Sequence, residues 1–236
     1  MLAVPEIQLA GLDYLLNGSE RSLDYVKRGI KLKGNHPRML LVGAQTAIDV
    51  NDLDSATEYL RDYLRLRPLK WYTIGSIAKD SLKPAQVLEV AKGGGVKTLV
   101  PIGIRVYSSP LELIYRMRFM ETALALFPTD PKLDDEERIW YEGQIRGEMA
   151  QYSVARVLMR KALELQPMNE EWRLEYITVL MKWRCHDEAY RLALMGSRYF
   201  PKSWKYPKLM RLNLEAAAEM GLKSMQLSTG YQNFDR

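Results

Sequence analysis

The segment from Gly93 to Thr98 contains the residue types of a phosphate-binding loop, with three glycines followed by a lysine and a threonine. Such a loop needs a glycine directly before the lysine, so that consecutive backbone N–H groups can surround the phosphate oxygens. Here Val96 separates Gly95 from Lys97, and a helical pattern precedes the glycines where a strand would be needed. We therefore do not expect this segment to bind a nucleotide.

Metal or disulfide chemistry would need more ligands than the sequence supplies. The chain has one cysteine, Cys185, and two histidines, His36 and His186. Structural zinc sites use four such ligands at suitable spacing, and adjacent residues such as Cys185 and His186 point in different directions. We expect these two residues to lie in a turn between helices without a chemical role, and we expect no metal, no cofactor and no internal disulfide.

Acidic residues are numerous, but their clearest clusters have a structural explanation. Residues 134–137 and 170–171 are acidic and stand directly before helical patterns. The free N–H groups at the start of a helix favour negative charge there. The sequence therefore indicates no catalytic residue, and we expect that the chain is not an enzyme.

Basic residues gather in the segment 182–211, where eight of them stand against Asp187 and Glu188. The bases are Lys182, Arg184, Arg191, Arg198, Lys202, Lys205, Lys208 and Arg211, and the aromatic residues between them are Trp183, Tyr190, Tyr199, Phe200, Trp204 and Tyr206. Bases attract phosphates and aromatic rings stack on nucleobases, so this segment could bind nucleic acid or an anionic membrane surface. Alternatively, most of the aromatic side chains pack between helices and the bases form a solvated face.

Length and composition are those of a folded, non-fibrous protein. The chain has 236 residues, of which 47% are hydrophobic and 27% charged, and a formal net charge of +5. A chain of this size can bury roughly 70% of the surface that its unfolded form exposes, so it needs no metal or disulfide for stability. The sequence has no secretory-signal pattern and no apolar run of about 18 residues. We expect a cytoplasmic location.

Small residues and prolines return at a constant interval. Pro167 and Pro201 are 34 residues apart, and so are Ala155 and Ala189. Further copies of the pattern are formed by Ala56 with Pro68 and, more weakly, by Ala123 with Pro128. A fixed period of this length is typical of helical repeat proteins.

The pattern resembles the tetratricopeptide repeat, a helix–turn–helix unit of 34 residues. The small residues and the proline of that family correspond, in the unit that starts at Glu136, to Gly143, Ala155, Ala162 and Pro167. Small side chains let two helices approach closely, and proline ends the second helix because it lacks an N–H and clashes with the preceding turn. Other positions depart from the family pattern, among them Ile139, Arg146 and Ile177.

Apolar spacing predicts the helices between the repeats. We expect helices over residues 7–16, 23–32, 38–50 and 53–67, and a final helix from 204 to 220 that ends the array. Residues 93–108 break the pattern, because three glycines and a run of β-branched residues disfavour a helix. We expect there an irregular or extended insertion between an N-terminal array (1–92) and a C-terminal array (109–236). Two roles are open for this insertion: either it carries binding contacts, or it is a plain spacer.

The resemblance also implies a binding surface on the first helix of each hairpin. The family's ligand-contacting positions correspond to Trp140, Gln144 and Glu148 in one unit and to Thr178, Met181 and Lys182 in the next. The spacing of i, i+4 and i+8 places the first three on one stripe of a helix. Trp140 either anchors a partner peptide there or packs inside the array.

We therefore expect an all-α fold, an α-solenoid of about ten to twelve antiparallel helices in hairpins with one irregular insertion. The function that the resemblance implies is a non-catalytic scaffold or complex subunit. Its concave surface would hold a peptide or helix of another protein, and a membrane would be reached only through that partner. Two alternatives remain: binding of nucleic acid or an anionic membrane surface through segment 182–211, and a soluble repeat region of a larger envelope enzyme.

Overall fold

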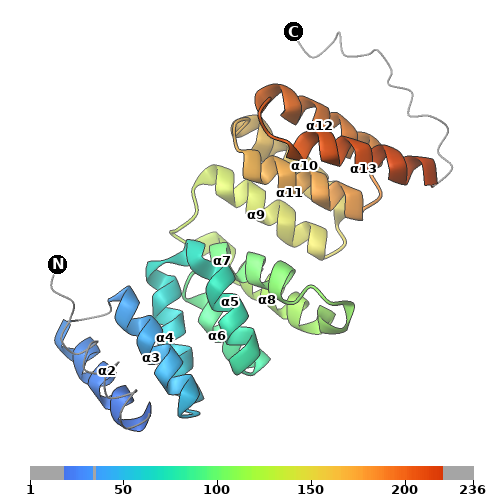
Figure 1. The fold of residues 1–236 in the computed structure, drawn as a ribbon. Coiled ribbons are helices and arrows are strands. Elements are labelled where there is room, and N and C mark those ends of the chain that lie inside the picture. Colours follow the sequence, from blue (N-terminus) through green and yellow to red (C-terminus); the bar gives the residue numbers. More distant parts are fainter. Residues whose placement is uncertain (1–18, 34–35, 220–236) are drawn as a thin grey trace. The chain divides into compact units, whose positions relative to one another are not determined.

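The computed structural model of the chain defines residues 19–33 and 36–219 (Figure 1). Every regular element within these residues is a helix, as an all-α fold requires. Three of the predicted helices are present as α2 (Ser19–Lys33), α3 (Pro37–Asp49) and α4 (Leu53–Leu66). The helix predicted over residues 7–16 lies outside the described residues.

The chain divides into two compact units, which meet in sequence between Ala155 and Arg156. The first unit continues after α4 with α5 (Trp71–Ser81), α6 (Pro84–Lys92), α7 (Val96–Pro101), α8 (Leu113–Leu126) and α9 (Asp135–Glu148). The second unit contains most of α10 (Tyr152–Leu165), followed by α11 (Glu170–Lys182), α12 (His186–Tyr199) and α13 (Lys205–Glu219). The predicted insertion at residues 93–108 therefore lies inside the first unit and does not separate the two.

Three hairpin turns share one backbone structure although their sequences differ. Asn51, Ala150 and Arg184 have left-handed φ angles of 60°, 60° and 58°. In each turn the N–H of this residue donates to the carbonyl three residues earlier, and the next N–H donates to the carbonyl five residues earlier, with N···O distances of 2.8–3.1 Å. This Schellman motif satisfies the last carbonyls of a helix as the chain turns. Because Ala150 and Arg184 are 34 residues apart, the repeat predicted from the sequence is visible in the backbone.

Prolines end four of the helices, as predicted. Pro68, Pro128, Pro167 and Pro201 each stand two residues after the end of a helix, namely α4, α8, α10 and α12. A proline N atom can donate no hydrogen bond, and its ring clashes with the preceding turn, so proline favours the end of a helix. The prolines therefore set the length of the second helix of each hairpin.

Small residues of the repeat pattern lie where helices approach most closely. Ala56, Ala155 and Ala189 are fully buried, with 0% of their surface exposed. Gly196 of α12 shows why size matters, because a Cβ atom at this position would lie 2.1 Å from the ring of Tyr206 on α13. At the level of the fold, the chain is an array of helical hairpins like that of tetratricopeptide-repeat proteins.

The prediction of an irregular or extended segment at residues 93–108 is wrong. After the glycine turn, Val96–Pro101 form α7 and Ile102–Val106 continue as one π-helical stretch, η2. Pro101 lies inside this run. In the stretch that follows it, the N–H of Tyr107 donates to the carbonyl of Ile102, five residues earlier, at 3.4 Å. Such a widening of the helix often accompanies a proline or a strained sequence.

Burial explains why this segment is helical against its propensity. Val96, Leu99, Val100 and Ile102 have 0% exposed surface and belong to the core of the first unit, where α7 packs on α8. Burying one such side chain stabilises by about 1.5–3 kcal/mol. The helix-propensity cost of a β-branched residue is only about 0.5 kcal/mol. The segment is thus a central helix of the first unit, not a spacer on its surface.

Candidate protein-interaction surface

The predicted binding stripe on α9 coincides with a packed face of that helix. Trp140 and Gln144 are only 1% and 7% exposed, and the buried residues of α9 include Gly143 and Gly147, which share their face. Glu148 is half-buried, and its Oε2 atom lies 3.3 Å from Nη1 of Arg116. Trp140 and Gln144 are therefore buried in this structure, and for Trp140 this agrees with the alternative that it packs inside the array.

The part of the prediction that falls on α11 remains accessible. Thr178 and Lys182 are exposed and Met181 is half-buried. Their spacing of i, i+3 and i+4 places them together on the C-terminal half of the helix. The Thr178 hydroxyl donates to the carbonyl of Leu174 at 2.9 Å. These three residues are named the α11 stripe below.

A polar network of the second unit fixes the opposite side of α11. Tyr176 is 1% exposed, and its hydroxyl donates to Oε1 of Glu188 on α12 at 2.9 Å. Arg156 and Arg160 of α10 also donate to this carboxylate, the latter at 2.7 Å. Burial alone would raise the pKa of Glu188, but the hydrogen bonds from Arg160, Tyr176 and Arg156 outweigh burial and hold this pKa below its ordinary value. One carboxylate thus joins three helices.

All eight bases of segment 182–211 are exposed, as both alternatives for this segment require. The aromatic residues of the segment divide into two groups. Tyr190 and Tyr206 are buried, and Trp183 and Phe200 are half-buried, whereas Tyr199 and Trp204 are 44% and 70% exposed. The prediction that most of these rings pack inside therefore holds for four of the six, and Trp204 is the clearest exception.

The inner side of α13 is anchored to α12. The ring of Tyr206 is fully buried and lies stacked on Phe200, with 6.0 Å between the ring centroids. Further along, Nδ1 of His186 lies 3.0 Å from Oδ1 of Asn213, whose amide donates to the carbonyl of Leu209 at 2.8 Å. Because this donation orients the Asn213 amide, its oxygen accepts from His186, which therefore carries a proton on Nδ1.

His186 is thus a buried structural residue at the first position of α12, directly after the N-cap residue Cys185. This position agrees with the expectation that the pair lies at a turn between helices. Within residues 19–33 and 36–219, no group of three or more His, Cys, Asp or Glu side chains is arranged to hold a metal ion. In the same residues, no helix has both the length and the apolar character needed to cross a membrane.

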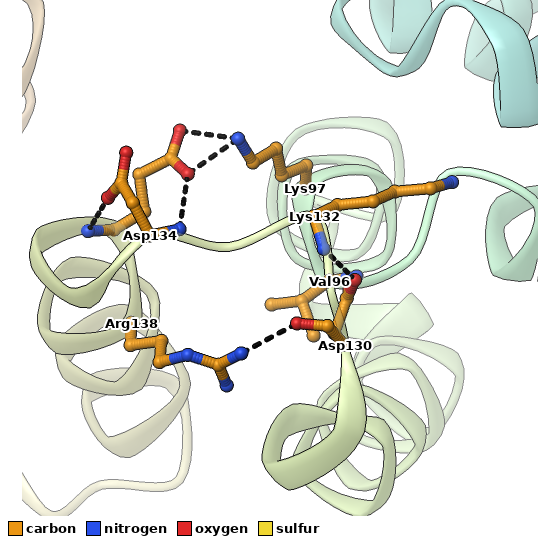
Figure 2. Close-up of polar contacts among 7 residues, drawn as sticks. Val96, Lys97, Asp130, Lys132, Asp134 and Arg138 are labelled. Carbon is orange, nitrogen blue, oxygen red and sulfur yellow. Dashed lines mark hydrogen bonds and ion pairs between the residues drawn. The ribbon is translucent and has the colours of Figure 1, made fainter.

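The sequence analysis missed a polar junction in the first unit, which Figure 2 shows. Asp130 is 6% exposed, and its carboxylate accepts hydrogen bonds from the backbone N–H groups of Val96 at 2.8 Å and Lys132 at 2.9 Å. Arg138 of α9 donates to the backbone carbonyl of Asp130 at 2.7 Å. Lys97 and Glu137 form an ion pair beside it, at 2.6 Å.

This junction explains the glycines that resemble a phosphate-binding loop. Gly95 has a left-handed φ of 72°, and a Cβ atom there would lie 2.2 Å from the Asp130 carboxylate. The negative charge at the start of α7 is therefore supplied by the chain itself, where a phosphate-binding loop would hold its ligand. No signal within the glycine segment could have revealed Asp130, because 34 residues separate it from Val96.

No model of a protein family matches the sequence, and no curated protein matches it. Several solved structures are similar to it. With the crystal structure of the APC/C hetero-tetramer Cut9–Hcn1, the chain shares 10% sequence identity over 89% of its length, with a TM-score of 0.43. With yeast Tom70 it shares 14% identity over 93% of its length, with a TM-score of 0.44.

The chain is also similar to PilW, a widely conserved type IV pilus biogenesis factor, with 17% identity over 91% of its length and a TM-score of 0.40. It covers 88% of the PilW chain. In contrast, it spans only 42% of the matched Cut9–Hcn1 chain and 48% of the Tom70 chain, less than half of each.

Proposed function

We propose that the chain is a non-catalytic scaffold or assembly subunit, which holds a segment of another protein along a concave helical surface within a larger complex. The observation that carries this proposal is the α11 stripe. Thr178, Met181 and Lys182 stand where the tetratricopeptide-repeat pattern places ligand contacts, and they remain accessible while the other side of their helix is packed.

Packing gives the α11 stripe a fixed position. The buried residues of α11 are Arg173, Tyr176, Ile177 and Leu180. Arg173 donates to the carbonyl of Pro167 at 2.8 Å, and its guanidinium lies 4.9 Å from the centre of the Tyr199 ring. A surface that is already ordered loses little entropy when a partner binds, which favours affinity.

The chemistry of the α11 stripe suits a peptide or a helix. The methyl group of Thr178 and the flexible thioether of Met181 provide apolar contact that can adapt to different side chains. Lys182 adds a positive charge at one end, which would pair with an acidic residue of the partner. Grooves of this kind bind amphipathic helices or extended segments.

Affinity purification of the full chain from its native source, with mass spectrometry of co-eluting molecules, tests the proposal. We expect a stoichiometric protein partner. A variant with Thr178→Arg and Met181→Glu should lose it, because both substitutions disrupt the apolar part of the stripe. The matched control is Arg118→Glu with Glu121→Lys, which changes two exposed residues of α8 in the first unit.

The result depends on comparing the two variants. Loss of the partner with the α11 variant and its retention with the α8 control would support the proposal. Retention with both variants, or recovery of RNA or lipid in place of a protein, would contradict it. Circular dichroism of both variants should match the unmodified chain, since all the changed side chains are at least partly exposed.

A further inference from the structure

One stretch of the second unit contains bases and no acids. From Ala189 to Leu214 the sequence has six Lys or Arg residues and neither Asp nor Glu. Five of the six fall within residues 198–211. The first turns of α11 and α12 contain two acids each, whereas α13 has no acid in its first turn and begins with Lys205. Bases at the N-terminal end of a helix interact unfavourably with the helix dipole, so the basic start of α13 is locally destabilising.

Three of these bases have no ion pair within the described residues. Arg211 pairs with Glu215 at 3.6 Å, and both side chains are more than half exposed. Within the residues that the structure describes, no carboxylate forms an ion pair with Lys202, Lys205 or Lys208. Three lysines thus remain in water close to one another in sequence, which raises the local positive potential.

An aromatic ring stands among these bases. Trp204 is 70% exposed, the highest value of any large apolar side chain in the second unit's described residues. Nζ of Lys208 lies 5.7 Å from the centre of its ring, within cation–π range. Lys205, Lys208 and Arg211 follow one another at intervals of three on α13, so they form one broad stripe. The set Lys202, Trp204, Lys205, Lys208 and Arg211 is named the α13 basic surface.

We propose that the α13 basic surface binds an acidic segment of a partner protein, in which carboxylates pair with the lysines and one apolar side chain packs on Trp204. This inference rests on the proposed function and specifies the chemistry of the partner. Charge complementarity selects an anionic ligand, and the exposed ring requires that the ligand also carry an apolar group. Aromatic and basic residues together are typical anchors at protein interfaces.

The state of the aromatic rings favours a protein over nucleic acid. Single strands are bound by several rings on which successive bases stack. Here Tyr206 is buried, Phe200 is stacked on it, and Tyr199 is 44% exposed. Only Trp204 offers more than half of its surface. A membrane would need several apolar side chains to insert, and within residues 189–214 no other large apolar side chain is more than 44% exposed.

Fluorescence polarisation with the full chain tests this inference. The probe is a labelled peptide in which Asp and Glu residues flank a single leucine, and the control peptide has Asn and Gln in their place. We expect binding of the acidic peptide only, weakening with added salt. The variant Lys202→Glu, Lys205→Glu, Lys208→Glu should weaken binding by at least about tenfold. Trp204→Ala should weaken it severalfold.

A matched control separates this surface from net charge. The variant Lys31→Glu, Lys70→Glu, Arg118→Glu changes three exposed bases of the first unit and alters the net charge equally. Equal loss of binding in both triple variants, or no binding of the acidic peptide, would overturn the inference. Tighter binding of oligo(dT) or of phosphatidylserine vesicles than of the peptide would overturn it as well. The α11 variants test the proposed function separately, since they leave the α13 basic surface intact.

Discussion

At the scale of single residues, Glu188 connects three helices of the second unit. Its carboxylate accepts hydrogen bonds from Arg156 and Arg160 of α10 and from Tyr176 of α11. Burial also raises the pKa of Tyr176, so this hydroxyl stays protonated and donates. A half-buried carboxylate without these donors would be strongly destabilising. The whole network therefore stabilises the fold by more than the sum of its separate ion pairs.

The lowered pKa of Glu188 makes this contribution pH-dependent. Because the folded pKa lies below the unfolded value of about 4.3, the unfolded chain binds more protons in acid. The stabilisation is thus complete above the unfolded pKa and is lost as the pH falls through the folded one. We expect Glu188→Gln to lower the free energy of unfolding by about 1–3 kcal/mol at neutral pH. This difference should shrink as the pH falls below the unfolded pKa of about 4.3, as urea titrations at several pH values would measure.

The neutral substitution of Glu164 provides the control for this prediction. Glu164 is exposed on α10, in the same unit. Glu164→Gln should change the free energy of unfolding by less than about 0.5 kcal/mol at every pH. If the deficit of Glu188→Gln stayed constant down to pH 3, the carboxylate would not carry the stabilisation.

At the scale of elements, each of the three Schellman turns has a residue other than glycine in the left-handed conformation, which is unfavourable for a residue with a Cβ atom. Ala150 is exposed and has a φ of 60°, which costs a residue with a Cβ atom about 1 kcal/mol compared with glycine. We expect Ala150→Gly to stabilise the chain by about 0.5 kcal/mol, since the gain exceeds the added entropy of the unfolded state. Chemical denaturation of the two proteins would measure the difference.

A glycine inside a helix serves as the matched control. Ala125 is exposed within α8, where φ has its ordinary helical value. Ala125→Gly should therefore destabilise by about 0.5–1 kcal/mol. Destabilisation by both substitutions would show that the turn at residue 150 gains nothing from glycine.

Asp130 and Asp134 allow a comparison of a buried and an exposed cap. Asp130 caps α7 from a distant loop, whereas Asp134 caps α9 locally and accepts from the N–H of Glu137 at 2.8 Å. Asp130→Ala leaves the buried N–H of Val96 without an acceptor, and we expect a loss of about 2–3 kcal/mol. Asp134→Ala should cost about 1 kcal/mol, because water can replace the lost acceptor. Equal losses, measured by thermal unfolding, would mean that the junction in Figure 2 is not a buried cap.

The elements that could be predicted from the sequence are those fixed by local residue types. Prolines and small residues at constant spacing located the hairpins, because the effect of Pro68 or Pro201 on the end of a helix is local. Segment 93–108 could not be predicted, because burial in the core decided its conformation and burial depends on distant residues. The sequence could not decide between the two alternatives for Trp140 for the same reason. Its stripe on α9 is amphipathic, but the sequence does not say which side is covered.

At the scale of the whole molecule, the division into two compact units gives the chain two separate stabilising centres. The Asp130 junction belongs to the first unit, and the Glu188 network belongs to the second. In repeat proteins each hairpin is stabilised mainly by its nearest neighbours, so a local defect stays local. Both proposed binding surfaces, on α11 and α13, lie in the same unit as the second centre.

Hydrogen exchange of the full chain should reveal this independence. We expect Asp130→Ala to speed amide exchange in α6 to α9 and to leave α11 to α13 unchanged, because its lost hydrogen bonds lie in the first unit. Glu188→Gln should have the opposite pattern. Faster exchange throughout the chain with either variant would show a single cooperative structure. In that case a substitution anywhere in the chain would weaken partner binding through stability alone, and the surface variants would need comparison at equal stability.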